Sequence, residues 1–201
     1  MSNIKLKEEY RYTQIINKSR FIGCAKRCTS EEEARLYIDS IRKEFSDATH
    51  VCTAFSIGQI QRSNDDHEPS GTAGIPILES IKNSNVDEVC ICIVRYFGGV
   101  KLGASGLIRA YSGTTTDTLA NAPKIQEITA EVYTLTFPYD LSGTLENYLR
   151  NNTTISSTDY TEQVTFTFST TDKDIIKKVQ DLTKGKVVPE LVGTTIIEAD
   201  I

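Results

Sequence analysis

Two stretches of the sequence combine glycines with charged side chains, as a site that binds a ligand would. The first is DDHEPSGTAG, residues 65–74. Gly71 allows the backbone to approach a ligand closely, and the hydroxyl of Thr72 is expected to cap a helix that begins near Ala73. The first N–H groups of a helix carry a partial positive charge. The stretch therefore predicts an anion site at this helix start.

The carboxylates of the same stretch allow a different chemistry. Asp65, Asp66 and Glu68 would oppose an anion unless a cation or an arginine intervened, and they could instead hold a divalent metal ion. Charged loop residues are usually only solvated, and solvation is the more common role for each of these acids taken singly.

The second stretch is RYFGGVKLGASGLIRAYS, residues 95–112. Arg95 ends a predicted strand, Lys101 lies inside the glycine-rich turn, and Arg109 comes about one turn into the next predicted helix. A nest of backbone N–H groups flanked by cations suits a phosphate or a carboxylate. The two aromatic residues after Arg95 add the stacking surface that single-stranded nucleic acid needs.

A purely structural interpretation of the second stretch is also open. In it, Phe97 belongs to the core, the glycines form turns, and Arg95 pairs with one of the carboxylates between residues 65 and 68. The two interpretations are compatible, because an ion pair can position a binding site.

The two stretches and the strand before them supply the candidate ligand-binding residues. His50 is included because it opens that strand, although a hydrogen-bonded structural imidazole is its more common role. We assign no catalytic residue, no metal and no cofactor. The candidates are His50, Asp66, Glu68, Ser70, Gly71, Thr72, Arg95, Tyr96, Gly98, Gly99, Lys101, Gly103, Gly106 and Arg109.

Known catalytic motifs are absent from the sequence. Residues 103–107, GASGL, have leucine where a nucleophile elbow needs glycine. Neither His50 nor His67 follows the serine in the chain order that α/β-hydrolases use. The phosphate-binding P-loop and the dinucleotide fingerprint are both missing.

The elements around the two stretches predict a mixed α and β fold. Residues 50–57, HVCTAFSI, and residues 89–94, VCICIV, are apolar on both faces and are expected to be internal strands. The polar residues 59–71 are expected to form a loop. Residues 107–120 are expected to form the helix that follows the glycine-rich turn.

A second pattern begins near residue 122, where acidic residues and threonine become frequent. The order of its elements is β-α-β-β-α-β, which is typical of a ferredoxin-like fold. We therefore expect an N-terminal α/β domain at 1–122 and a C-terminal domain at 123–201. The expected strands and helices of the second are 130–137, 141–149, 155–160, 163–168, 174–182 and 186–197.

Composition limits the partners of the chain. Lys and Arg total 22 and Asp and Glu total 27, which gives a net charge of −5. The first 121 residues hold 15 basic and 15 acidic residues, so the whole excess lies in the rest. Composition alone thus predicts no nucleic-acid binding, and RNA would need a local basic cluster in the N-terminal part.

The five cysteines are an odd number in a chain that is not small, which argues against a disulfide framework. They stand among apolar neighbours and are expected to be buried structural thiols rather than zinc ligands. The N-terminus has no apolar core of a signal peptide, and no run is long enough for a spanning helix. We therefore expect a cytoplasmic protein without a membrane partner.

Three motifs carry a resemblance to a known family. HVCTAF (50–55), DDHEPSGTAGIPIL (65–78) and RYFGGVKLGASGLIRAYS (95–112), in this order and spacing, resemble the YigZ/IMPACT family of small cytosolic proteins. The resemblance covers roughly residues 18–122. Two positions depart from it, since His67 and Ser105 stand where glycine is common.

The resemblance implies an N-terminal domain similar to the second domain of ribosomal protein S5. It also implies a C-terminal domain similar to the end domains of the ribosomal translocase, elongation factor G. Eukaryotic members act as translation regulators, partly through an extra domain that has no counterpart here. Some bacterial members carry a proline-dipeptidase label, for which this chain has no recognisable metallopeptidase motif.

Two functions from different classes remain. The first is a non-enzymatic, translation-related regulator that binds RNA, the ribosome or a translation factor through the glycine-rich loops. The second is an enzyme acting on a small phosphorylated or carboxylated substrate. In that case Asp66 or Glu68 would hold a metal or act as general base, and Arg109 would clamp the anion.

Overall fold

A computed structural model of the chain describes residues 4–201. The chain divides into two compact units. The first contains the residues up to Gln126 together with Ala199–Ile201, and the second contains Glu127–Glu198.

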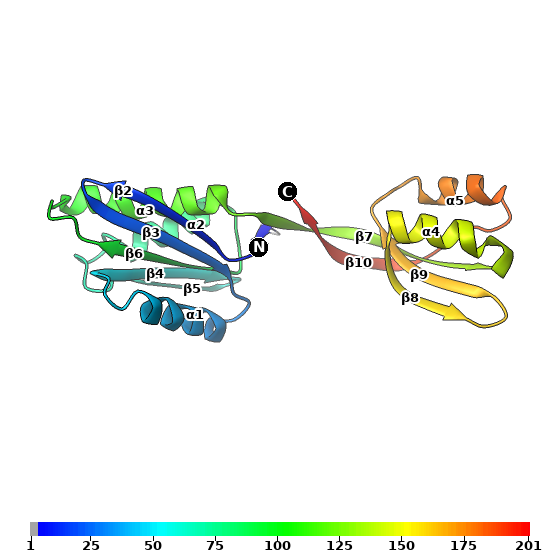
Figure 1. The fold of residues 1–201 in the computed structure, drawn as a ribbon, viewed down its shortest axis with the longest axis horizontal. Coiled ribbons are helices and arrows are strands. Elements are labelled where there is room, and N and C mark those ends of the chain that lie inside the picture. The colour runs from blue at the N-terminus through cyan, green and yellow to red at the C-terminus, as the bar shows by residue number, and fades with distance from the viewer. Residues whose placement is uncertain (1–3) are drawn as a thin grey trace. The chain divides into compact units, whose positions relative to one another are not determined.

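The first unit is built on a five-stranded antiparallel sheet with the strand order β2-β3-β6-β4-β5. Figure 1 shows α1 on one face of this sheet and α2 and α3 on the other. Its elements are β1 (Ile4–Leu6), β2 (Tyr10–Ile16), β3 (Ser19–Arg27), α1 (Glu31–Glu44), β4 (His50–Ile57), β5 (Ile60–Asn64), α2 (Gly74–Asn83), β6 (Val89–Tyr96) and α3 (Gly103–Asn121).

The sheet separates two apolar cores, as the sequence predicted for its internal strands. In β6 the apolar residues alternate between the cores: Ile91 and Ile93 pack towards α2 and α3, and Cys90 and Cys92 pack towards α1. All four are fully buried. A strand buried on both faces is the physical reason for the continuous apolar run of β6.

Helix α1 begins after a serine N-cap, Ser30. The backbone N–H of Glu33 donates to Ser30 Oγ at 3.2 Å, which is one half of a capping box. The carboxylate of Glu33 accepts from the backbone N–H of Thr29 at 2.7 Å rather than from that of Ser30. This hydrogen bond lowers the pKa of Glu33.

Two expectations for the first unit are wrong. Within the expected loop 59–71, residues Ile60–Asn64 form β5, whose five exposed side chains lack the apolar alternation that identifies a strand. Helix α3 begins at Gly103 rather than at residue 107. Glycine is a poor helix former, so the glycines at 103 and 106 hid the first turn of this helix.

The second unit has the expected β-α-β-β-α-β order. Strands β7, β9 and β8 pair antiparallel, and β10 pairs with β7. Figure 1 shows α4 and α5 on one face of this sheet. The elements are β7 (Lys124–Phe137), the short 3₁₀ helix η1 (Tyr139–Leu141), α4 (Ser142–Asn152), β8 (Thr154–Tyr160), β9 (Val164–Thr170), α5 (Ile175–Thr183) and β10 (Glu190–Asp200).

The core of the second unit lies between this sheet and its two helices. Phe137, Phe166 and Phe168 are fully buried there together with Leu145 and Val179. The first and last strands differ from the sequence-based bounds. β7 begins at residue 124 instead of 130, and β10 begins after Pro189 instead of running through it.

All five cysteines are buried and free. Burial raises the pKa of the Cys24 and Cys52 thiols to about 12, which keeps both protonated at neutral pH. Within residues 4–201, no helix has the length and apolar character needed to cross a bilayer.

Candidate functional site

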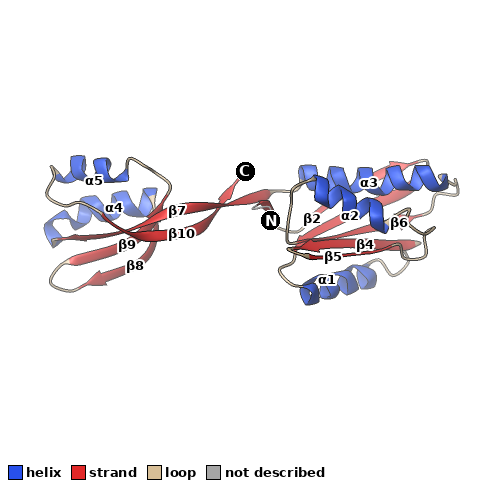
Figure 2. Cartoon of the chain, turned by 180° about the vertical axis from the view of Figure 1, so that it is seen from behind, coloured by secondary structure: helices blue, strands red, loops and turns tan. Residues whose placement is uncertain are grey.

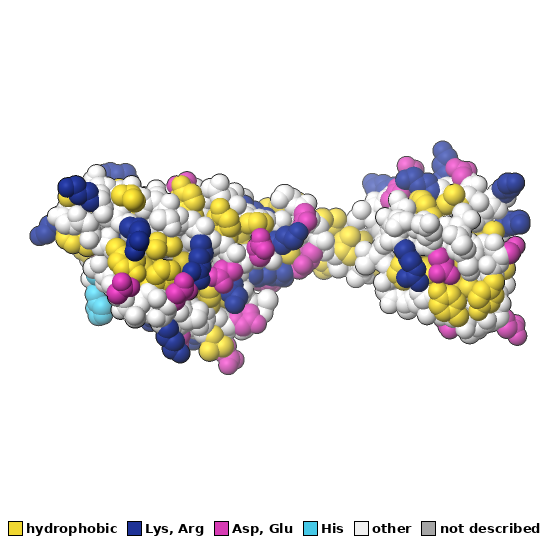
Figure 3. All heavy atoms as spheres, viewed as in Figure 1, with side chains coloured by type: hydrophobic (Ala, Val, Ile, Leu, Met, Phe, Trp, Pro, Cys, Tyr) yellow, Lys and Arg dark blue, Asp and Glu magenta, His cyan; other side chains and the backbone are white. Residues whose placement is uncertain are grey.

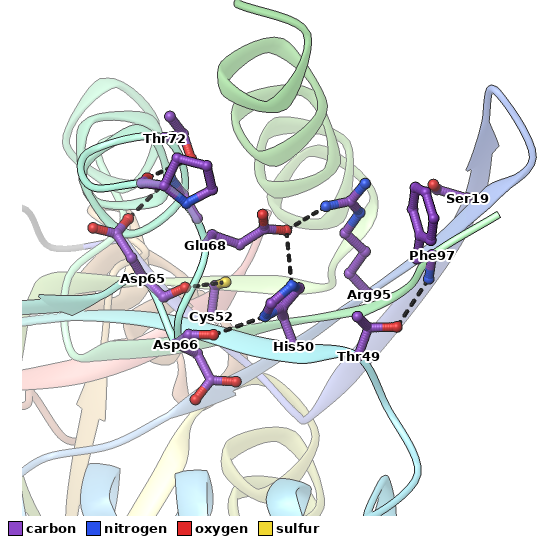
Figure 4. Close-up of polar contacts among 12 residues, drawn as sticks. Ser19, Thr49, His50, Cys52, Asp65, Asp66, Glu68, Thr72, Arg95 and Phe97 are labelled. Atoms are coloured by element: carbon purple, nitrogen blue, oxygen red, sulfur yellow. Dashed lines mark hydrogen bonds and ion pairs between the residues drawn. The ribbon is translucent and has the colours of Figure 1, made fainter. Parts of the chain in front are cut away.

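The two glycine-rich stretches meet in the first unit through a buried ion pair. Arg95, at the end of β6, donates from Nη1 to Glu68 Oε1 at 2.5 Å (Figure 4). The two side chains are only 6% and 3% exposed. This is the pairing that the structural interpretation of the sequence allowed.

Glu68 is fixed by more than the arginine. The hydroxyl of Tyr111, from α3, donates to the same Oε1 at 2.8 Å, and His50 Nε2 lies 3.8 Å from it. Burial raises the pKa of Tyr111, so this hydroxyl stays protonated and remains a donor. The thiol of Cys52 donates to the backbone carbonyl of Asp65 at 3.0 Å, and its sulfur lies 3.3 Å from the Tyr111 oxygen. Elements β4, β6 and α3 thus hold one carboxylate in place.

His50 is oriented by the backbone of the acidic loop. Its Nδ1 lies 2.8 Å from the carbonyl oxygen of Asp66. A carbonyl can only accept, so Nδ1 carries the proton and a neutral His50 has its lone pair on Nε2. The Asp66 carboxylate accepts from the Val51 N–H at 2.7 Å and ties the same loop to β4.

Two non-glycine residues of this loop have a left-handed backbone. The φ angles are +45° at Asp66 and +67° at His67. Asparagine, aspartate and histidine enter this region more readily than other residues. His67, which departs from the glycine that the family resemblance implies, therefore adopts the left-handed backbone itself.

The start of α2 is already occupied by a side chain of the protein. The carboxylate of Asp65 accepts from the N–H groups of Gly71, Ala73 and Gly74 at 2.7–3.0 Å. Burial alone would raise the pKa of Asp65, but these three donors together lower it. The expected anion site at the start of α2 therefore holds the protein's own carboxylate.

The expected cap by Thr72 is also wrong. Its hydroxyl donates to the carbonyl of Pro69 at 2.7 Å, and the residue before α2 is Ala73. A loop carboxylate replaces the hydroxyl at this helix start because it can accept from several N–H groups at once.

The start of α3, in contrast, opens onto a pocket of about 460 Å³. Among the described residues no side chain caps this helix, so its first N–H groups have no such acceptor. The walls consist of Thr49, His50, Glu68, Pro69, Arg95, Phe97, Lys101, Leu102, Gly103, Ala104 and Leu107. We call this cavity the α3 pocket.

Arg95 keeps donors for a ligand at the α3 pocket. Its guanidinium carbon lies 5.5 Å from the ring centres of both Phe21 and Phe97. Within the described residues Glu68 is the only side chain that accepts from it, and the buried Nε has no partner. A buried guanidinium with unmet N–H groups favours an acceptor from outside the chain.

The structure separates the candidates into two groups. His50, Glu68, Arg95, Lys101 and Gly103 line the α3 pocket. Phe97, considered in the sequence only for stacking or for the core, also lines it and is 47% exposed. The remaining pocket residues are mostly apolar or small, and nothing in their types singled them out.

Several candidates have other positions. Arg109 does not line the pocket: α3 begins four residues earlier than expected, which moves Arg109 into its second turn, where it is exposed. The expected convergence of three cations is therefore reduced to Arg95 and Lys101. The hydroxyl of Tyr96 donates to Asp47, and its ring packs against Arg20 at 4.3 Å.

The glycines act through the backbone. A Cβ at Gly98 would lie 2.0 Å from the carbonyl carbon of Lys18, so only glycine fits there. Gly99 has a φ of +84°. Gly106 lies inside α3, and Gly71 and Ser70 lie in the acidic loop near Asp65 rather than at the α3 pocket.

The acidic residues do not converge on a common point. Asp65 bonds to α2, Asp66 to β4 and Glu68 to Arg95. In residues 4–201, no group of three or more histidine, cysteine or acidic side chains is placed to hold a metal ion. The chemistry of the α3 pocket is instead that of an anion site: a guanidinium, a lysine and free helix N–H groups beside an exposed aromatic ring.

The chain is thus a small protein of two units, each with both helices and strands. Comparison with known proteins identifies its family. Residues 17–119 match the Impact N-terminal domain, and residues 135–186 match a domain of unknown function, DUF1949. The chain belongs to the IMPACT family, which confirms the resemblance seen in its motifs.

Named relatives extend over most of the chain. The IMPACT family member YvyE of Bacillus subtilis (strain 168) is 37% identical over 192 residues, 92% of this chain and 88% of that protein. The family member YigZ of Escherichia coli (strain K12) is 37% identical over 129 residues, 62% and 63% of the two chains. A solved structure described as a hypothetical protein covers 96% of this chain and 98% of its own, with 29% identity and a TM-score of 0.61.

Proposed function

We propose that this protein is a non-enzymatic, translation-related regulator that binds RNA, free or in the ribosome, at the α3 pocket. The observation that carries the proposal is the uncapped start of α3 facing Lys101 and the buried guanidinium of Arg95. Family membership supports the translational part, since the resemblance implies regulators of translation among the eukaryotic members.

Each part of the α3 pocket has a role in this binding mode. A backbone phosphate would be bound by the α3 N–H groups and Lys101, because a helix start and an ammonium group both favour an anion. A neighbouring base would stack on the exposed ring of Phe97, and stacking is insensitive to sequence. The proposed ligand is therefore single-stranded.

The charge distribution predicts local rather than extended contact. Figure 3 shows basic and acidic side chains intermixed over the face of the first unit that it presents. With about two phosphates neutralised, the logarithm of the affinity should fall with slope −1.4 against the logarithm of salt concentration. This slope corresponds to a loss of about sevenfold between 50 and 200 mM salt.

Fluorescence anisotropy with a labelled 12-nucleotide oligo(U) and the full chain tests the proposal. Lys101→Gln should reduce the salt effect from about sevenfold to about 2.6-fold, because one phosphate contact is lost. Phe97→Ala should weaken binding about fivefold or more, since a stacked base contributes about 1–3 kcal/mol. Lys177→Gln, which removes an exposed lysine of the second unit, is the matched control and should change neither value.

Absence of oligo(U) binding at 50 mM salt, together with absence of ribosome co-sedimentation, would refute the proposal. Binding that both lysine variants weaken equally would also refute it, because the contact would then depend on overall charge and not on the α3 pocket.

A second candidate function is an enzyme that acts on a small phosphorylated or carboxylated substrate. The observation in its favour is the placement of His50 Nε2 3.8 Å from Glu68 in the wall of a concave pocket. A thermal-shift panel of metals and phosphorylated metabolites tests it. A ligand at 100 times its Kd stabilises a protein by about 2.7 kcal/mol, so silence across the panel would exclude such a site.

A further inference from the structure

A second cavity lies in the first unit between α1 and the edge strand β5. It has a volume of about 340 Å³. Arg35 and Arg42 from α1 and Arg62 from β5 line it over the apolar side chains of Ile38 and Phe55, and Asp39 is the one acidic residue of its lining. We call this cavity the arginine groove. Figure 2 shows α1 on one side of strands β4 and β5 and α2 on the other.

Strand β5 leaves part of its backbone unpaired. Among residues 4–201 it pairs only with β4. A two-residue turn connects the two strands, and Ile57 and Ile60 are the register pair next to this turn. The pair next to such a turn is hydrogen-bonded, and hydrogen-bonded pairs then alternate. The N–H and C=O groups of Gln61 and Ser63 therefore point away from the sheet, and Arg62 Nη1 bonds to the Gln61 carbonyl at 2.9 Å.

Two of the three arginines of the groove, Arg42 and Arg62, retain free donors, whereas Arg35 is hydrogen-bonded to Glu31. Arg42 lies 3.7 Å from Asp66 and Arg62 lies 4.0 Å from Glu31, both beyond hydrogen-bond distance. Within the described residues, Arg42 makes no hydrogen bond and Arg62 makes only the one to its own strand. Both are well exposed, at 43% and 60%. Planar guanidinium groups with free N–H pairs match carboxylates in geometry and charge.

We propose that the β5 edge and the arginine groove together dock an extended acidic peptide of a partner protein by strand addition. The peptide backbone would pair with the N–H and C=O groups of Ser63 and with the N–H of Gln61. Arg62 would exchange the Gln61 carbonyl for a carboxylate of the peptide, and that carbonyl would then pair with the peptide as well. In a strand, alternate side chains share one face, so acidic residues at every second position would all reach the arginines. Phe55, the register partner of Arg62, packs towards α1, so Arg62 also points to the groove side.

The open strand edge is the reason to favour a peptide over a nucleic acid. A phosphate backbone would use the arginines but has no groups that continue a β-sheet ladder. Only a peptide satisfies both features, and its acidic character follows from charge complementarity with the groove.

The test uses the full chain and a fluorescein-labelled peptide of four Thr-Glu repeats, measured by anisotropy. We expect saturable binding, and the double variant R42Q/R62Q should weaken it at least tenfold. The same peptide with every second amide N-methylated should also bind at least tenfold more weakly, because strand pairing needs those N–H groups. Lys43→Gln, next to Arg42 on α1 but outside the groove, should change the affinity less than twofold.

Three results would overturn the proposal: no binding of the acidic peptide, equal binding of a Thr-Lys peptide, or full binding of the N-methylated peptide. Competition by oligo(U) that disappears in R42Q/R62Q would also overturn it and would assign the groove to RNA. Circular dichroism of each variant shows that the fold is retained, and exposed arginine positions are expected to tolerate glutamine.

Discussion

The pair formed by Arg95 and Glu68 should be the most sensitive electrostatic interaction of the first unit. Both side chains are almost fully buried, and the ion pair is only 2.5 Å long. Removal of one partner from a buried pair leaves an uncompensated charge and costs about 3–5 kcal/mol. We therefore expect Arg95→Met and Glu68→Gln each to lower the free energy of unfolding by about that amount.

The double variant R95M/E68Q separates the charge effect from packing. It removes both charges and leaves side chains of similar size, so its free energy of unfolding should lie within about 1–2 kcal/mol of that of the wild-type protein. The coupling energy in the double-mutant cycle should then be about 4 kcal/mol or more, well above the scatter of independent sites. The Tyr111 hydroxyl donates to Oε1 of Glu68. Because the glutamine side chain also carries an Oε1, this hydroxyl keeps its acceptor in all three variants.

Urea denaturation of the full chain, followed by circular dichroism, measures these changes. The two units are expected to unfold in separate steps, so the transition of the second unit is an internal control that should not move. If the losses of unfolding free energy in the two single variants simply add in the double variant, with a coupling energy below about 1 kcal/mol, the view that the buried pair acts as one unit is refuted.

Three further predictions concern the loops. His67→Gly should stabilise the protein by about 0.5–1 kcal/mol. Glycine removes the steric cost of the left-handed backbone at residue 67, and this gain exceeds the conformational entropy that glycine adds to the unfolded chain. His67→Ala, which keeps a Cβ, should bring no gain in the same urea assay. Gly98→Ala should destabilise by about 3 kcal/mol, because its Cβ would overlap the Lys18 backbone; an unchanged melting curve would contradict the close approach. Asp65→Asn should cost about 1 kcal/mol at pH 7. The pKa of Asp65 in the folded protein lies below its usual 3.8. The stabilisation by the carboxylate is therefore fully present above pH 3.8 and is lost as the pH falls through the folded pKa. At such low pH the melting curves of the wild-type protein and of Asp65→Asn should converge.

The elements that position the site could be predicted where burial imposes a pattern. The apolar runs of β4 and β6 identified both strands, since burial on two faces constrains residue type. β5 gave no such signal, because all its side chains face solvent. The start of α3 was hidden by Gly103 and Gly106, which favour turns by composition but lie within the helix.

The candidate site could be predicted only in part. The meeting of Arg95 with a carboxylate of the acidic loop follows from opposite charge, and Glu68 is the partner. The role of Asp65 did not follow from residue type, because the sequence does not distinguish a carboxylate that accepts from a helix start from one that is only solvated. Arg109 was misplaced for a geometric reason: a shift of four residues in a helix start moves a side chain by more than one turn.

The α3 pocket joins stability and binding in one residue. Glu68 holds Arg95 in place, and its negative charge also opposes any anion that Arg95 would bind. Lys101 and the free N–H groups of α3 supply positive potential that no carboxylate of the pocket wall directly neutralises. A bound phosphate should therefore lie nearer to Lys101 and α3 than to Arg95. Arg95, whose guanidinium carbon lies 5.5 Å from the centre of the Phe97 ring, supports the ring on which a base would stack, and its remaining N–H groups would make the second, weaker phosphate contact.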